Sequence, residues 1–208
     1  MKKNIFAIDG LTASGKGTIA KQISKYFNIP YLNTGALYRA IGFELSKLNF
    51  NDFSNVNEIL KIAKSIDFTD LEREELFTEE NGGWASKVAK IQEIRDFLFK
   101  MQVDFTNSPT GAVLDGRDIG TVICPDAEYK FFIVATPEER AKRRYKEMCE
   151  KNVKTSYEEI LQKIKDRDYN DINRPIAPLV KAKDAIEVDT TNMNKQEVFD
   201  YILKYIHK

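Results

Sequence analysis

Apolar residues along this chain follow two different periods. Short continuous runs such as residues 5–8 indicate buried strands, whereas segments such as 17–27 repeat apolar residues every three or four positions and indicate amphipathic helices. Strands are predicted at residues 4–9, 30–32, 112–115, 128–135 and 185–188, and helices at about 17–27, 34–48, 55–65, 84–105 and 194–206. Strands that alternate with helices imply a parallel sheet covered on both faces, which is an α/β fold.

Two further helices are marked by their first residues. Thr136 stands directly before Pro137 and three residues before Glu139, which is the pattern of an N-cap followed by proline in the first turn. Ser156 and Glu159 form a second signal of this kind, a capping box. We therefore expect helices to begin just after positions 136 and 156.

Regular alternation is lost in the stretch of about 51–95, which we expect to be a small insert. Residues 66–70 and 74–80 predict a hairpin within it. A chain of 208 residues favours one domain that carries such an insert. We predict a single domain over residues 1–208, with its core at 1–50 and 106–208.

Composition narrows the class of partner. The 32 basic and 32 acidic residues balance, so the chain lacks the basic field that binding to nucleic acid or to a membrane surface usually requires. No apolar run approaches the length of a membrane span. Cys124 and Cys149 are far apart, so no zinc or disulfide framework follows from them. We expect a reduced, cytoplasmic protein, a monomer whose partners are small molecules.

Residues 10–16 read Gly-Leu-Thr-Ala-Ser-Gly-Lys and match the phosphate-binding pattern G-x-x-x-x-G-K. The segment follows a predicted buried strand and precedes a predicted helix, a context that disfavours a chance glycine-rich turn. Its glycines allow backbone N–H groups to surround phosphate oxygens, and the helix N-terminus adds partial positive charge. We assign to ATP, with Lys16 on the β- and γ-phosphates, the residues Gly10, Thr12, Ala13, Ser14, Gly15, Lys16, Gly17 and Thr18.

The end of this loop differs from the commonest form. The residue after Lys16 is Gly17, where Ser or Thr is usual, and Thr18 follows. This G-K-G-T ending is similar to the loop of nucleoside-monophosphate kinases. It weakens the expectation that a hydroxyl group ligates Mg²⁺ directly. We therefore expect Mg²⁺ to be held mainly through the nucleotide phosphates, with no metal site built from protein ligands alone.

Two other classes of P-loop protein lack support in the sequence. A GTPase would carry an Asn-Lys-x-Asp segment, and the nearest approach, residues 194–197, ends in Glu and has the pattern of a helix N-cap. An adenylate kinase would carry a Gly-Phe-Pro-Arg-like segment after its third strand. Residues 115–121 stand there instead and read Asp-Gly-Arg-Asp-Ile-Gly-Thr.

Arginine is sparse in this chain, which makes its positions informative. Only nine of the 32 basic residues are Arg, and only the planar guanidinium group binds phosphate or carboxylate through two parallel hydrogen bonds. Arg167, Asp171 and Arg174 are spaced so that a helix would place all three on one face. They predict an anion site, and a surface ladder of ion pairs is the alternative.

Five segments together closely resemble bacterial cytidylate kinases, and they lie in order over most of the chain. They are the loop from Asp9 to Thr18, residues 34–39 (Thr-Gly-Ala-Leu-Tyr-Arg), residues 86–95 with Ser86, Val88, Ala89, Ile94 and Arg95, residues 115–121, and residues 167–179 with Arg167-Asp168, Asn173-Arg174 and Ala177-Pro178-Leu179. The resemblance implies a three-layer P-loop fold with a five-stranded parallel sheet. It also implies transfer of a phosphoryl group from ATP to CMP or dCMP.

The resemblance further implies roles for individual residues of an acceptor site. The acceptor phosphate would be bound by Arg39 and Arg174 with Arg117 near it, the ribose by Thr34, Arg167 and Asp171, and the cytosine by Ser86, Arg95 and Asp118. Asp118 would accept a hydrogen bond from the N4 amino group. Because the acceptor phosphate is itself a nucleophile, no general base is required.

Arg140, Arg143 and Arg144 follow the helix start at Thr136. Similar kinases place arginines here to close over the ATP phosphates, with residues of about 145–157 as a short lid. A solvated helix face is the alternative, above all for Arg140. Closure would exclude water, which otherwise competes as acceptor. The residues expected to neutralise charge on the transferring group, and hence to be catalytic, are Lys16, Arg117, Arg144 and Arg174.

The chain departs from the family pattern in several places. The stretch between Arg39 and Ser86 is shorter than in typical members, Val134 stands where Asp is frequent, Thr34 replaces Ser, and Gln92 takes a usual Pro position. Two other functions stay open. One is a kinase for a different small acceptor, and the other is a regulatory nucleotide-binding module without turnover.

Overall fold

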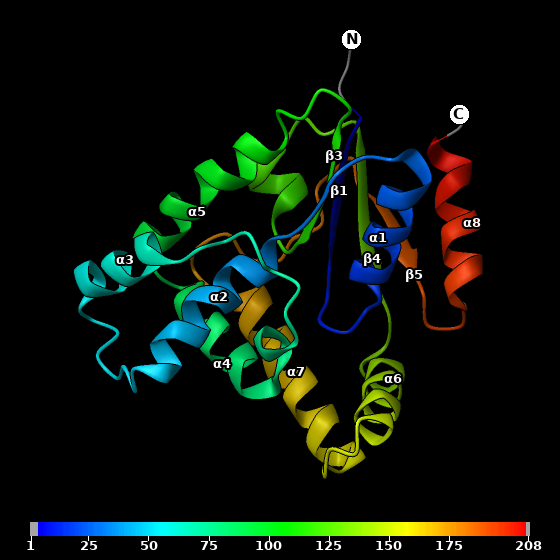
Figure 1. Ribbon diagram of the computed structural model, residues 1–208. Coiled ribbons are helices and arrows are strands. Elements are labelled where there is room, and N and C mark those ends of the chain that lie inside the picture. Colours follow the sequence, from blue (N-terminus) through cyan, green and yellow to red (C-terminus); the bar gives the residue numbers. More distant parts are fainter. Residues whose placement is uncertain (1–3, 207–208) are drawn as a thin grey trace. The chain divides into compact units, whose positions relative to one another are not determined.

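The computed structural model describes residues 4–206, which form two compact units (Figure 1). The first unit contains the chain up to Tyr31 and from Ser108 onward, and the second contains Leu32–Asn107. The expected insert at about 51–95 lies inside the second unit, and its own bounds, like those of the lid, stay predictions. No helix among the described residues is both long and apolar enough to cross a membrane.

A five-stranded sheet forms the framework of the first unit. Its strand order is β2-β3-β1-β4-β5, and β1 pairs in parallel with both β3 and β4, as β4 does with β5. The predicted α/β fold with a five-stranded parallel sheet is confirmed. The elements are β1 (Ile5–Gly10), α1 (Lys16–Phe27), β2 (Tyr31–Asn33, which continues into the second unit), β3 (Ala112–Gly116), a π-turn (Ile119–Ile123), β4 (Tyr129–Val134), α6 (Pro137–Glu150), α7 (Tyr157–Asn173), β5 (Ile186–Asp189) and α8 (Lys195–Ile206).

The core of this unit lies between the sheet and helices α1 and α8, which cover one of its faces (Figure 1). Ile23 of α1 and Ile202 of α8 pack with Phe6 and Ile8 of β1, and all four side chains are fully buried. Because the paired strands are parallel, their carboxyl ends meet at one edge of the sheet. The segments after β1, β3, β4 and β5 therefore begin close together, and those after β1, β3 and β4 carry the predicted site residues of this unit.

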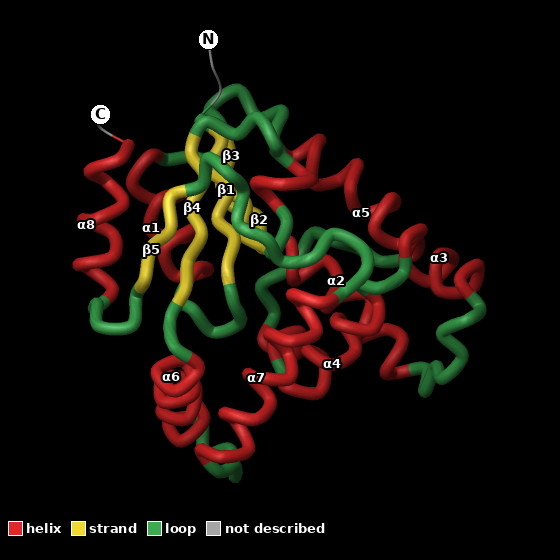
Figure 2. Tube along the Cα trace, turned by 180° about the vertical axis from the view of Figure 1, so that it is seen from behind, coloured by secondary structure: helices red, strands yellow, loops and turns green. Residues whose placement is uncertain are grey.

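Helices α6 and α7 pack side by side, as Figures 1 and 2 show. Their shared core is formed by Ala141, Met148, Ile160 and Ile164. Both predicted helix starts are confirmed. The hydroxyl group of Thr136 accepts from the backbone N–H of the third helical residue of α6, and the capping box at the start of α7 is complete.

The second unit is helical. Its elements are α2 (Thr34–Lys47), α3 (Val56–Ser65), a 3-10 turn (Glu74–Phe77), α4 (Glu79–Val88) and α5 (Gln92–Phe105). Apolar residues at helical spacing on α2, α3 and α5 meet in one buried core that includes Leu37, Ile41, Ile59 and Leu98. The helices predicted at about 34–48 and 55–65 are confirmed.

The hairpin predicted over residues 66–80 is wrong, because this segment contains no strand. The hydroxyl group of Thr78 caps α4 by accepting from the N–H of Asn81 at 3.2 Å. The side-chain amide of Asn81 donates to the carbonyl oxygens of Leu76 and Arg39 at 2.9 and 3.0 Å. Side-chain bonds to the backbone therefore fold the segment into a turn that leads into a helix.

The single helix predicted over 84–105 is two helices, with a break at residues 89–91. Ile91 has an extended backbone (φ −92°, ψ 116°), and the guanidinium group of Arg95 donates to the carbonyl oxygen of Ala89 at 3.4 Å. Gln92 is the first residue of α5, a position where Pro often marks a helix start. Because this chain has Gln at that position, no proline marks the start of α5, and the apolar pattern continues across the break.

Candidate active site

The phosphate loop forms between β1 and α1, as the sequence predicts. Three of its residues have positive φ angles: Gly10 (151°), Ala13 (54°) and Gly15 (89°). A β-carbon at Gly10 would lie 2.1 Å from the carbonyl oxygen of Ile133 on β4, so glycine is required there. Gly15 directly precedes Lys16, the first residue of α1, so the unbonded N–H groups of the first helical turn adjoin the loop.

The ammonium group of Lys16 reaches back to the loop and donates to the carbonyl oxygen of Leu11 at 3.1 Å. Burial of this group and the nearby charge of Arg117 lower the pKa of Lys16, and the carboxylate of Asp115 opposes the shift. A poorly solvated cation among other positive charges binds an anion favourably. The position of Lys16 therefore suits a phosphate group.

The sequence prediction omits Asp115, the carboxylate near the end of β3. It lies beside the start of α1, since a β-carbon at Gly17 would be only 3.2 Å from Asp115 Oδ2. The hydroxyl group of Tyr31 donates to Asp115 Oδ1 at 3.2 Å, and burial raises the pKa of Asp115. This proximity accounts for the G-K-G-T ending, because a larger residue at position 17 would press against the carboxylate. An apolar run that ends in Asp beside the loop strand was the available signal.

The residues around the loop fit a Mg²⁺ ion that is held mainly through a nucleotide. Within residues 4–206, no group of three or more His, Cys, Asp or Glu side chains could hold a metal by itself. Asp115 supplies a buried carboxylate close to Lys16, and oxygen is the ligand that Mg²⁺ prefers. Thr18 is exposed. This donor set suits an ion whose principal ligands are phosphate oxygens.

Arg117 and Asp171 form a short ion pair at the same edge of the sheet. Arg117 Nε donates to Asp171 Oδ2 at 2.7 Å, and the two side chains are 15% and 11% exposed. Burial alone would raise the pKa of Asp171, but the charges of Arg117 and Arg167 outweigh it and hold the pKa below its usual value. Arg117, Arg167 and Asp171 also act on the charge of Lys16. The structure thus brings four of the predicted residues together.

Arg174 does not lie on the same helix as Arg167 and Asp171, contrary to the expectation from their spacing. Helix α7 ends at Asn173, and Arg174 is extended (φ −65°, ψ 141°). Pro175 explains this end, since proline disfavours helical backbone in the residue before it. The guanidinium group still reaches the site, where Nη2 lies 3.6 Å from Asp118 Oδ1. Nε donates to the carbonyl oxygen of Ala177 at 2.6 Å.

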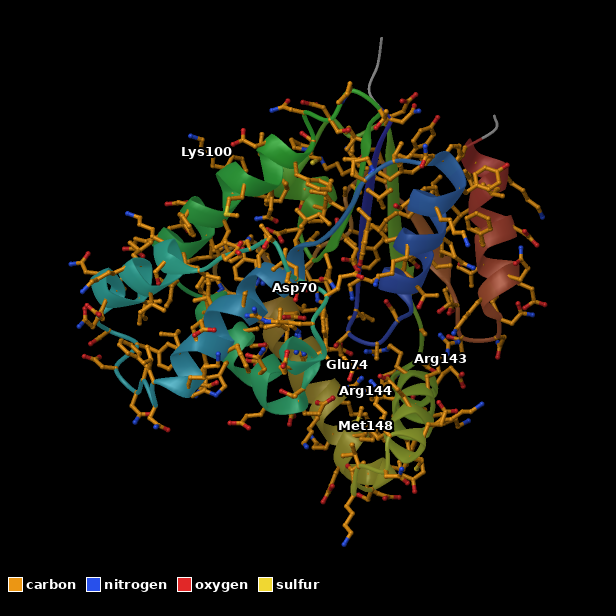
Figure 3. The ribbon with its side chains drawn as sticks, in the orientation of Figure 1. Asp70, Glu74, Lys100, Arg143, Arg144 and Met148 are labelled. Carbon is orange, nitrogen blue, oxygen red and sulfur yellow. The ribbon has the colours of Figure 1, made fainter. Side chains whose placement is uncertain are left out.

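Arg143 and Arg144 lie on α6 (Figure 3). Arg143 donates to the carbonyl and hydroxyl oxygens of Thr190, just after β5, at 2.6 and 3.2 Å, and to Glu139 at 3.1 Å. Arg144 pairs with Glu147 at 2.8 Å. Their contact with ATP stays a prediction. Neither expectation for Arg140 was right, because it is almost fully buried instead of lying on a solvated face or facing a ligand.

The other four predicted acceptor residues lie in the second unit. Thr34 is the first residue of α2 and is buried. Arg39, on the same helix, donates to two carbonyl oxygens of residues 76–78 at 2.8 and 3.0 Å. Ser86 lies on α4, which packs against α2, and Arg95 lies buried on α5. Their contact with a substrate stays a prediction.

Asp9 is a buried carboxylate on β1 to which the sequence prediction gives no role. Its Oδ1 accepts from the N–H of Ile119 at 2.8 Å, and its Oδ2 accepts from the N–H of Gly120 at 2.7 Å. These residues begin the π-turn that directly follows Asp118. One side chain therefore fixes the segment after β3 to the strand that leads into the phosphate loop.

Asp9 should titrate well above the usual range of a carboxyl group. Burial raises the pKa of Asp9 to about 6, although the two backbone hydrogen bonds lower it. Its contribution to the free energy of unfolding is therefore present below the ordinary value of 3.8 and lost as the pH rises through about 6. In NMR spectra, the amide signals of Ile119 and Gly120 should shift together with that midpoint and should not do so in Asp9→Asn. Midpoints at the ordinary value would contradict this expectation.

The first unit thus carries a phosphate loop and, at neighbouring strand ends, a second set of arginines paired with carboxylates. Two substrates that each bear phosphate would account for both. This is the organisation of P-loop nucleoside-monophosphate kinases, which transfer a phosphoryl group between nucleotides.

Comparisons with known proteins specify the family. A family model described as cytidylate kinase matches residues 6–208, so the chain belongs to the cytidylate kinase family. The cytidylate kinase of Clostridioides difficile is 44% identical, covering 98% of this chain and 98% of that protein. The cytidylate kinase of Fusobacterium nucleatum is 43% identical, covering 100% and 99%.

Solved structures bear on the fold alone. An uncharacterised protein of Eubacterium ventriosum matches with a TM-score of 0.57 at 18% identity, covering 99% of each chain. A protein of Chloroflexus aurantiacus described as a kinase matches with a TM-score of 0.53 at 11% identity, covering 100% of this chain and 98% of the other. Both agree with the α/β architecture found here.

Proposed function

We propose that this protein transfers the γ-phosphoryl group of ATP to CMP, and also to dCMP, giving ADP with CDP or dCDP. Membership of the cytidylate kinase family supports the reaction. The structural observation that carries the proposal is the buried charged cluster of Arg117, Asp171, Asp118 and Arg174 at the same sheet edge as the phosphate loop. A module that only bound one nucleotide would not need this second cluster.

The donor side of the proposed reaction uses the phosphate loop. The phosphates of ATP bind the backbone of residues 10–15 and Lys16, while Arg143 and Arg144 close over them. Mg²⁺ bound to those phosphates, with Asp115 nearby, supplies further positive charge. Phosphoryl transfer requires alignment and charge neutralisation more than covalent chemistry. The proposed catalytic residues are therefore Lys16, Arg117, Arg144 and Arg174.

The acceptor side matches each part of CMP with a complementary group. We assign the phosphate to Arg39 and Arg174, the ribose to Thr34, Arg167 and Asp171, and the cytosine to Ser86, Arg95 and Asp118. Arg174 lies close to Asp118, so in this assignment a residue that binds the phosphate lies next to one that binds the base. Asp118 accepts from the N4 amino group, a donor that CMP has and UMP lacks.

The setting in which this reaction occurs is also inferred. We place the enzyme in the cytoplasm as a monomer that acts on small molecules and binds no nucleic acid. The balance of 32 basic and 32 acidic residues supports this inference. No specific observation favours a kinase for another acceptor or a regulatory module without turnover.

A panel of nucleoside monophosphates, assayed by ADP release from ATP, tests the proposed function. CMP and dCMP should be phosphorylated, and UMP should be used at least about tenfold less efficiently, because a buried acceptor loses its partner. Turnover of another monophosphate while CMP and dCMP both fail would show that the cytosine assignment is wrong. If the rate of ADP release is the same with and without every acceptor, the protein is not a nucleoside-monophosphate kinase.

Asp118→Ala should narrow the preference for CMP over UMP by about tenfold, since the variant can no longer accept a hydrogen bond from the N4 amino group of CMP. The ratio of kcat/KM for the two acceptors is the measured quantity. Asp126→Ala is a matched control, because Asp126 is exposed in the loop before β4 and should leave the ratio unchanged. An unchanged ratio in Asp118→Ala would remove Asp118 from base recognition.

A further inference from the structure

Arg140 on α6 is the largest fully buried side chain in the described part of the chain, with 1% of its surface exposed. Each of its three nitrogens donates to a different segment of the first unit. Nε bonds the carbonyl oxygen of Ala135 at 2.9 Å, Nη1 that of Thr12 at 3.1 Å, and Nη2 bonds Asp168 Oδ2 at 2.6 Å. Because the guanidinium group is planar and rigid, it fixes these three partners relative to one another.

The bond to Thr12 acts on the phosphate loop itself. The peptide between Thr12 and Ala13 is planar, so its carbonyl oxygen and its N–H point in opposite directions. With the oxygen held by Arg140, the N–H of Ala13 must point away from Arg140. Ala13 also has a φ of 54°, a conformation that is unfavourable for a residue with a side chain and persists only where its surroundings impose it. Arg140 supplies such a constraint.

The bond to Asp168 anchors Arg140 from the other side. Asp168 lies on α7, one residue after Arg167 and three before Asp171, and its side chain is 12% exposed. A buried ion pair of this kind is costly to break, because removal of one partner leaves the other charge unpaired. The pair therefore connects the phosphate loop with the helix that carries two of the predicted acceptor residues.

We propose that Arg140 is a positioning residue for the donor phosphates: it orients the Thr12–Ala13 peptide so that the N–H of Ala13 is presented to ATP, and Asp168 holds Arg140 in place. Arg140 itself touches no substrate. The inference rests on the proposed kinase function. Lysine cannot substitute for it, because an ammonium group donates from a single atom and cannot reach all three partners.

Arg140→Lys tests this role, with binding of ATP measured by calorimetry in the absence of CMP. We expect the dissociation constant for ATP to rise about tenfold, while the KM for CMP stays within about twofold of the unmodified enzyme. Asp184→Asn is a matched control, since it removes the negative charge from the pair between Asp184 and the buried Lys130 (2.6 Å), and the phosphate loop takes no part in this pair. That control should lower the melting temperature and leave ATP affinity unchanged.

Arg140→Lys that lowers the melting temperature but keeps ATP affinity within about twofold would overturn the proposal and leave Arg140 a structural residue. If this variant does not fold, Asp168→Asn keeps the side-chain volume and one acceptor oxygen. Its dissociation constant for ATP should rise about threefold, and an unchanged value would also overturn the proposal. If the unmodified protein itself does not bind ATP, the proposed function fails and not the role of Arg140 alone.

Discussion

Lys16→Met should lower kcat by about 100- to 1000-fold, the usual effect of removing one preorganised charge from a site where charge develops. Methionine is unbranched like lysine, lacks only the terminal ammonium group in length and keeps most of the volume of the side chain, so the loss isolates that group. That group bonds the phosphate loop at Leu11 and lies at the start of α1. Initial rates of ADP formation at saturating ATP and CMP give the measured effect.

The same substitution should not destabilise the protein. Burial and the charge of Arg117 lower the pKa of Lys16, so the folded chain disfavours the charged form, and methionine removes this penalty. The melting temperature should be at least that of the unmodified protein. Lys25→Met, exposed in the last turn of the same helix, is the control and should keep full activity. A Lys16→Met enzyme with normal kcat would contradict the assignment of the loop.

Asp171→Asn should lower kcat/KM for CMP by about 100-fold or more, because it leaves the buried guanidinium group of Arg117 without its counter-charge. Asn can still accept one hydrogen bond from Arg117 Nε, so the loss reports mainly on charge. The short distance of 2.7 Å and the low exposure of both side chains make this pair sensitive to the change. The measurement is steady-state kinetics with CMP varied at saturating ATP.

A double-mutant cycle makes this expectation sharper. Combining Asp171→Asn with Arg117→Met should cost much less than the sum of the two single losses, since both remove the same interaction. Asp166→Asn, which is exposed on the same helix, should leave kcat/KM unchanged. Additive losses in the cycle would mean that the two residues act independently in the reaction.

Sequence alone predicted the fold where the determining signal is local. The apolar runs at 112–115 and 128–135 became β3 and β4, because a strand buried in a parallel sheet is apolar on both faces. The hairpin at 66–80 failed because Asn81 bonds the backbone carbonyl group of Arg39, 42 residues earlier in the chain, as well as that of the nearby Leu76. Such contacts leave no trace in periodicity. The break before Gln92 was missed for a different reason, because Gln stands where a proline would have marked the helix start.

In the candidate site, too, the parts with a local signal could be predicted and those that depend on distant partners could not. The phosphate loop is contiguous, so its chemistry could be derived directly from residues 10–16. The end of α7 before Arg174 has a local signal in Pro175, although the spacing of Arg167, Asp171 and Arg174 by itself favours a continuous helix. Arg140 could not be interpreted correctly, because its partner Asp168 is 28 residues away and its contact with the loop spans 128 residues. Only the folded chain brings these groups together.

Transfer of the γ-phosphoryl group to CMP can be observed directly by ³¹P NMR of ATP, Mg²⁺ and CMP with purified protein. The γ-phosphate signal of ATP and the monophosphate signal of CMP should decrease together, with equal amounts of ADP and CDP formed and no inorganic phosphate. Conversion of ATP to ADP and inorganic phosphate while CMP is unchanged, or no reaction at all, would contradict cytidylate kinase activity.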